Sequence, residues 1–191
     1  MFTPLPPSAA WSHRLARTGF EVTYFREEQS GFLIEGCATA AEDDLVWIID
    51  YRLRLDQDWH TRSVRIDGRY PTARRTLTVD ADGLGHWRVD GVAAPELDGC
   101  LDIDLAASAF TNALPVHRLD LAVGSAADAP AAYVAAEDLT VTRLPQHYRR
   151  LPAETGHRYD YAAPAFDYHA TLTYDTAGLI VDYPGLAVRT A

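Results

Sequence analysis

The segment Asp58-Trp59-His60-Thr61-Arg62 places a carboxylate, an imidazole and a guanidinium within five residues. In an enzyme, these groups could act as general acid, general base and anion clamp. On a strand, His60 and Arg62 would share one face, and Asp58 would lie in the preceding turn. The chain contains no Gly-x-Ser-x-Gly motif that would supply a nucleophile. We therefore favour a structural pairing of these residues over catalysis.

A group of three aspartates, Asp98, Asp102 and Asp104, could hold a divalent cation, because side chains two residues apart on a strand point the same way. Their spacing is not that of an EF-hand loop, and the seven histidines form no His-x-His or His-Glu-x-x-His run. We expect these carboxylates to lie on a solvated face or to cap a helix. No metal site and no cofactor are predicted. Cys37 and Cys100 are expected to be buried free thiols.

Asn112 is the only asparagine in the chain. Its presence in a sequence that otherwise avoids asparagine indicates a specific hydrogen bond, either at the end of a helix or toward a ligand. A helix cap is the commoner role for such a residue.

The composition excludes several classes of protein. A formal charge of -10 argues against a nucleic-acid partner. All 17 basic residues are arginine, and the absence of lysine removes Schiff-base chemistry and a Walker-type phosphate loop. The N-terminal residues lack the pattern of a signal peptide, and no apolar run approaches the roughly 20 residues that a transmembrane segment needs. These features predict a cytoplasmic protein without a transmembrane segment.

Alternating apolar and polar residues dominate the chain, most clearly over residues 45–56, and predict strands at intervals of roughly 8–12 residues. The alternation stops over residues 105–114, where alanines favour a short helix and Pro115 should end it. A strand is predicted again over 116–123, and residues 133–144 are predicted to form one strand with a bulge at 137–138. The pattern favours a single mainly β domain over residues 1–191, with residues 1–10 as an extended arm.

A series of short motifs runs through most of the chain in order. They are Asp58-Trp59-x-Thr61-Arg62, Gly85-x-Trp87, Leu97-x-Gly99-Cys100-x-Asp102-Ile103-Asp104-Leu105, Thr111-Asn112-x-Leu114-Pro115-Val116-x-Arg118-Leu119, Gln146-x-Tyr148 and Asp182-Tyr183-Pro184-Gly185-Leu186-x-x-Arg189. In these motifs the chain resembles the bacterial glycolipid-binding family, once known only as a domain of unknown function. The resemblance implies a spiral β-roll of many antiparallel strands wrapped around a single short α-helix at about residues 105–114. It also implies a role in binding or handling glycolipids, and it places no catalytic residue.

Two main hypotheses follow from these features. The first is a non-catalytic protein that holds a lipid or glycolipid between a curved, aromatic-rich sheet and the central helix. Its candidate ligand-binding residues are Trp59, Arg62, Trp87, Asn112, Arg118 and Tyr148. The alternative is a hydrolase or isomerase that acts on a small molecule through Asp58, His60, Arg62 or Asp102. A homodimer that pairs exposed edge strands is a third interpretation.

Overall fold

A computed structural model describes residues 2–15, 17–42 and 45–191. Within these residues, fourteen strands form one large sheet. Its strands are β1 (Ser8–His13), β2 (Thr18–Glu28), β3 (Gly31–Glu42), β4 (Leu45–Leu55), β5 (Thr61–Arg69), β6 (Arg74–Ala81), β7 (Trp87–Val89), β8 (Val92–Ala93), β10 (Ala126–Asp128), β13 (His147–Leu151), β14 (His157–Ala163), β15 (Tyr168–Tyr174), β16 (Ile180–Tyr183) and β17 (Ala187–Arg189). All of its pairings are antiparallel, in the order β10-β13-β14-β15-β16-β17-β1-β2-β3-β4-β5-β6-β7-β8.

A smaller sheet and a helical segment come from the middle of the chain. In this sheet β11 (Ala131–Val134) pairs in parallel with β9 (Asp102–Leu105) and antiparallel with β12 (Val141–Leu144). The helical elements are η1 (Pro95–Leu97), η2 (Phe110–Asn112), α1 (Ala113–Leu119) and η3 (Pro164–Phe166), of which only α1 is an α-helix among the described residues. The fold is therefore mainly β with one short helix, as the sequence predicts.

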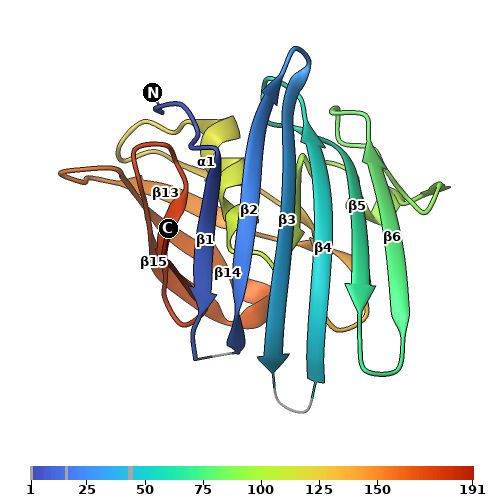
Figure 1. Cartoon of the computed structure of the whole chain (residues 1–191). Coiled ribbons are helices and arrows are strands. Elements are labelled where there is room, and N and C mark those ends of the chain that lie inside the picture. Colours follow the sequence, from blue (N-terminus) through green and yellow to red (C-terminus); the bar gives the residue numbers. More distant parts are fainter. Residues whose placement is uncertain (1, 16, 43–44) are drawn as a thin grey trace.

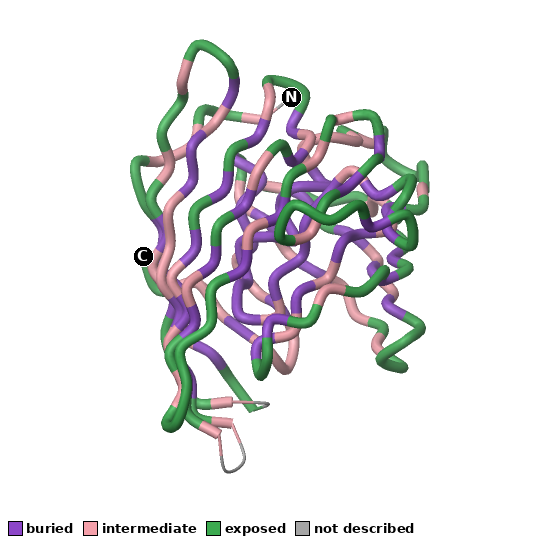
Figure 2. Tube along the Cα trace, turned by 90° about the vertical axis from the view of Figure 1, so that its right-hand side faces the viewer, coloured by how far each residue is buried: buried purple, intermediate pink, exposed green. Residues whose placement is uncertain are grey.

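The large sheet curls around a central segment, which consists of the small sheet, η2 and α1. The first and last strands along the chain, β1 and β17, pair with each other, so the strands nearest the two termini lie in the middle of the sheet. Figure 1 shows β1 to β6 as one layer, with β13, β14 and β15 crossing behind it and α1 behind the upper ends of β1 and β2. Buried residues gather in the middle of the molecule, and exposed residues follow the loops and the outward strand positions (Figure 2).

The strands form where the sequence alternates. On β4, Trp47, Ile49, Tyr51, Leu53 and Leu55 are all buried, while the residues between them are half-buried or exposed. This is the pattern of a strand with one face on the core, and it confirms the clearest strand that the sequence predicts.

The helix differs from the prediction in its position. Leu105 still belongs to β9, and α1 starts eight residues later, at Ala113. Pro115 lies in the first turn of α1, where its missing N–H has no helical acceptor to lose, so it begins the helix rather than ending it. The predicted helix over 105–114 is therefore placed too early, since only residues 110–114 of that range are helical, in η2 and the start of α1, and the predicted strand over 116–123 is wrong. The helix ends at Leu119, and the next residue, Asp120, adopts a left-handed conformation with φ of 33°.

Two further local predictions fail at turns. Residues 133–144 form two strands, β11 and β12, because the chain reverses between them through Leu139, whose φ is +63°. At the start of β5 the register with β4 shifts between Arg54 and Leu55. His60 precedes the strand, whereas Arg62 lies on it and is exposed, so the prediction that His60 and Arg62 share one face of a strand is wrong.

Candidate functional site

A cavity of about 260 Å³ lies between the central segment and the tyrosine-rich strands of the C-terminal half. Four consecutive strands of the large sheet, β14 to β17, supply one wall through Tyr161, Tyr168, Tyr183 and Ala187. The opposite wall comes from the end of β9, the turn after it and η2. The small sheet closes a third side through β11 and β12.

The tyrosine wall follows from the period of the strands. On β14, Tyr159, Tyr161 and Ala163 alternate with more exposed residues and are all buried, so they share the inner face. The ring of Tyr161 lies 6.0 Å from that of Tyr168 and 6.1 Å from that of Tyr183, measured between centroids. These three rings form a continuous aromatic surface, and the hydroxyls of Tyr161 and Tyr168 are held by hydrogen bonds with the Gln146 side chain and the Pro184 carbonyl.

The mouth of the cavity is more exposed than its floor. Phe166, which is 53% exposed, packs against Tyr133 with 5.1 Å between ring centroids. Glu137 is exposed and Glu42 is half-buried at the same boundary, whereas Ser108 and Asn112 are buried at the floor. The cavity thus has an aromatic and acidic rim and a polar floor.

Asp104 is the charged group of the floor. Its carboxylate accepts hydrogen bonds from the Thr111 hydroxyl at 3.0 Å and from the Gln146 side-chain amide at 2.6 Å. The same amide lies 3.0 Å from the Tyr161 hydroxyl, which links the floor to the tyrosine wall. Burial raises the pKa of Asp104 to about 6, although its two hydrogen bonds act in the opposite direction.

Asn112 joins the floor to the strands behind it. The Tyr148 hydroxyl donates to its side-chain oxygen at 2.9 Å, and the Tyr174 hydroxyl donates to its backbone oxygen at 3.3 Å. Asn112 precedes α1 but makes no side-chain cap, so the cap role is wrong. Its specific hydrogen bond is to a buried tyrosine of the large sheet.

A fully buried glutamate fixes the turn that separates β9 from η2. Glu21 accepts hydrogen bonds from the Ser108 hydroxyl at 2.5 Å, the Tyr51 hydroxyl at 2.6 Å and the Ala109 backbone N–H at 2.7 Å. Burial raises the pKa of Glu21. Arg17 donates to the Ala106 carbonyl at 2.7 Å and so holds the same turn from its other side.

Asp102 and Arg118 form a buried ion pair instead of facing solvent. The Arg118 Nη2 atom lies 2.6 Å from Asp102 Oδ2, and Nε lies 3.0 Å from Oδ1. The side chains are 1% and 11% exposed for Asp102 and Arg118, respectively. The expectation of solvated or helix-capping carboxylates is therefore wrong for both Asp102 and Asp104. Both aspartates are buried because they find partners on later segments.

Of the six predicted ligand-binding residues, Asn112 lines this cavity, and Tyr148 lies directly behind it. Trp87 is buried and donates its indole N–H to the Cys100 carbonyl at 2.9 Å. Trp59 stacks on His117 with 3.6 Å between ring centroids, beside the N-terminal residues. Arg62 is on the surface, 3.7 Å from Asp56. The structure therefore does not bring the six residues together.

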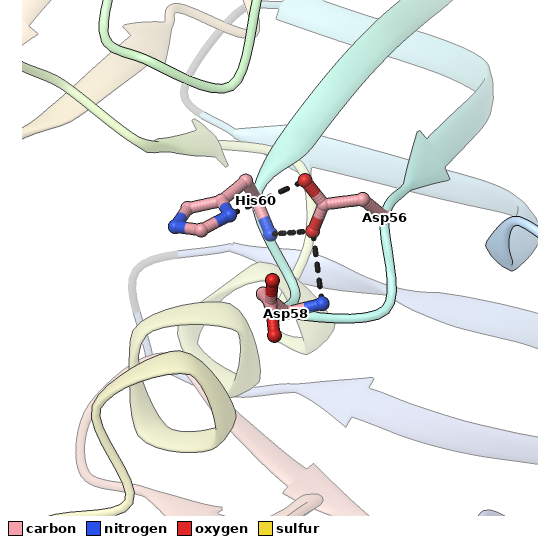
Figure 3. A group of neighbouring side chains, drawn as sticks. All are labelled: Asp56, Asp58 and His60. Atoms are coloured by element: carbon pink, nitrogen blue, oxygen red, sulfur yellow. Dashed lines mark hydrogen bonds and ion pairs between the residues drawn. The ribbon is translucent and has the colours of Figure 1, made fainter.

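Three residues of the enzymatic alternative, Asp58, His60 and Arg62, lie close together around Asp56 but away from the cavity, and Asp102 is buried in its pair with Arg118. Figure 3 shows Asp56, Asp58 and His60 in the turn before β5. Asp56 accepts from the backbone N–H groups of Asp58 and His60 at 3.0 and 2.9 Å, and its other oxygen lies 3.2 Å from His60 Nδ1. The Asp56 carboxylate thus stabilises its own turn. None of Asp58, His60, Arg62 and Asp102 lines the cavity beside Asn112.

Comparison with known proteins places the chain in a family. The family described as "Putative glycolipid-binding" matches residues 8–189. The chain belongs to this family. A crystal structure of a DUF1089 family protein from Pseudomonas aeruginosa is similar to this glycolipid-binding family member, with a TM-score of 0.79 and 39% identity over 89% of this chain and 92% of that chain.

A second solved structure shares the fold of this glycolipid-binding family member at low identity. It is a β-barrel-like protein of the domain of unknown function DUF1849 from Brucella abortus, with a TM-score of 0.53 and 11% identity over 99% of this chain and 96% of that chain. No curated protein sequence matches the chain. No helix in the described part of this family member is long and apolar enough to cross a membrane.

Sequence reasoning missed most of the cavity of this family member. Tyr161, Tyr168 and Tyr183 come from separate strands, and only the pairing of those strands makes them neighbours. Glu21 lies on an inward face of β2, where hydrophobicity alone gives no reason to expect it. The density of tyrosines over residues 159–183 was the available signal, since a curved sheet can gather them on one face.

Proposed function

We propose that this protein is a non-catalytic binder of a glycolipid or related lipid, and that the cavity beside Asn112 receives the polar headgroup. The observation that supports this most is the convergence of three tyrosine rings and several buried polar groups on one cavity. Binding sites for small molecules combine an aromatic or apolar lining with a few fixed polar groups in this way.

The size of the cavity favours a headgroup over acyl chains. Its volume of about 260 Å³ is slightly below the range for ligand pockets, roughly 300–1,000 Å³. A single sugar ring can stack on a tyrosine face and direct its hydroxyls to Asn112 and Ser108 at the floor. The apolar part of the ligand then leaves through the mouth, past Phe166 and Leu186.

A titration of the isotope-labelled protein with octyl glucoside, kept below its micelle concentration, tests the proposal by NMR. We expect chemical-shift changes to concentrate at residues of the cavity. The variant Ala163→Leu should abolish them, because Ala163 is buried in the cavity wall and a larger side chain fills the space. Ala135→Leu is the matched control, since Ala135 does not line the cavity. Equal binding by Ala163→Leu and wild type would count against this site.

A further inference from the structure

The cavity holds a buried carboxylate that no cation neutralises. Asp104 is 7% exposed, and among the described residues it takes part in no ion pair. Its two hydrogen-bond donors, Thr111 and Gln146, are both neutral. Nearby Asp102 is already paired with Arg118 and adds negative potential at Asp104. A buried negative charge without a cationic partner is costly, so a positively charged ligand would be stabilised beside it.

The other charged residues of the cavity lining also carry a net negative charge. Glu42 and Glu137 add two carboxylates at the rim, against one guanidinium, that of Arg17. Arg17 is turned to other partners: it donates to the Ala106 carbonyl and to His13, and its guanidinium carbon lies 5.3 Å from the ring centroid of Trp47. An anionic headgroup such as a phosphate would therefore meet more negative than positive charge in this cavity.

The aromatic faces of the cavity also favour a cation. The rings of Tyr161, Tyr168 and Tyr183 lie within 5.7 to 6.1 Å of one another, measured between centroids. Tyrosine faces attract a cation placed within about 6 Å, and the attraction is larger where water is excluded. Tyr161 is linked to the Asp104 cluster through Gln146, so the rings and the carboxylate border the same space.

We propose that the cavity selects a headgroup that carries a cationic nitrogen over one that is neutral or anionic. The nitrogen lies between Asp104 and the faces of Tyr161 and Tyr183, and the rest of the headgroup faces Asn112 and Ser108. A free amino sugar and a quaternary ammonium group both offer this chemistry. The inference rests on the proposed function, because it assigns the charge of the ligand that the same cavity binds.

Two matched pairs of small ligands test the inference on the full chain by NMR titration. Choline is compared with 3,3-dimethyl-1-butanol, its neutral isostere, and glucosamine is compared with glucose. We expect the cationic member of at least one pair to bind in the cavity about tenfold more tightly than its neutral partner. The pair that shows this preference identifies the source of the nitrogen. Glucose 6-phosphate should bind more weakly than glucose.

Variants test which residues cause the preference for a cationic ligand. Asp104→Asn should reduce the affinity for the cationic ligand about tenfold and leave that for the neutral partner within about twofold, since the asparagine can still accept from Gln146 and donate to Thr111. Tyr168→Leu should weaken the cationic ligand more than the neutral one, because it removes one aromatic face. Asp138→Asn is the matched control, an exposed carboxylate outside the lining whose loss should change neither affinity.

The outcomes separate the two proposals. Equal affinities for the members of both pairs, or tighter binding of the neutral members, would overturn the charge preference while leaving the cavity as the binding site. If octyl glucoside and all four small ligands leave the cavity resonances unchanged, both proposals fail. If Asp104→Asn does not fold, the comparison of choline with its isostere in the wild-type protein still decides the question.

Discussion

The buried pair of Asp102 and Arg118 should contribute to stability and not to ligand binding. The pair is bidentate, with the Arg118 Nη2 to Asp102 Oδ2 distance at 2.6 Å and Nε to Oδ1 at 3.0 Å, and neither side chain lines the cavity. In Arg118→Met the Asp102 carboxylate stays buried without its partner. Removing one member of a buried pair costs roughly 3–5 kcal/mol of unfolding free energy.

Urea denaturation at pH 7 measures this cost, and a second variant separates its causes. Asp102→Val combined with Arg118→Met removes both charges, so the double variant should regain most of the stability that the single variant loses. The dependence of this stability difference on pH is a further test. Loss of Arg118 raises the pKa of Asp102 further, so protonation of Asp102 in acid should shrink the difference between Arg118→Met and wild type.

An exposed pair provides the matched control. Arg65 lies 3.0 Å from Asp67, but the two side chains are 57% and 46% exposed. Arg65→Met should cost less than about 1 kcal/mol. The reasoning is refuted if Arg118→Met costs no more than Arg65→Met, or if the double variant is as unstable as the single one.

Three further predictions concern other buried groups. Because the pKa of Asp104 is raised to about 6 from 3.8, its contribution to stability is present in acid and falls as the pH rises from about 4 to about 6. Asp104→Asn should remove that part of the pH dependence in denaturation curves, an amount on the order of 2–3 kcal/mol. Glu21→Ala should lower the unfolding free energy by at least about 3 kcal/mol in the same assay, since it removes the carboxylate that accepts from three buried donors, and a cost below 1 kcal/mol would contradict this account. Gly178→Ala should lower the melting temperature, because φ at Gly178 is +74° and an added Cβ would lie 2.6 Å from His117 Nε2; an unchanged melting temperature would contradict this prediction.

The strands were predictable because one-face burial leaves a local mark on the sequence. The strand β4, Leu45–Leu55, differs from its predicted range of 45–56 by a single residue. Alternation of apolar and polar residues with a period of two is enough to identify such strands. The family motifs then supplied the overall architecture, which alternation alone does not determine.

The position of the helix was not predictable from local propensity. Ala106, Ala107 and Ala109 favour a helix, yet residues 106–109 form turns because Glu21 and Arg17 bind their backbone from the large sheet. Pro115 is compatible with either end of a helix, since proline stops a helix from continuing but also suits its first turn.

The floor of the cavity was not predictable from local sequence, because it is formed by contacts between distant segments. Asp102 and Asp104 alternate with Ile103 and Leu105, which favours a solvated face, but Arg118 and Gln146 allow both carboxylates to be buried. The sequence separations are 16 and 42 residues. No pattern within a single strand carries that information, so the composition of the floor required the folded structure.

A crystal structure of the protein with a bound alkyl glycoside tests the central claim most directly. We predict density for the sugar ring against the surface formed by Tyr161 and Tyr183, with its polar groups near Asn112 and Asp104 and its alkyl chain leaving past Phe166. Sugar density elsewhere, for example against the stacked rings of Trp59 and His117, with the tyrosine-lined cavity empty, would contradict the account.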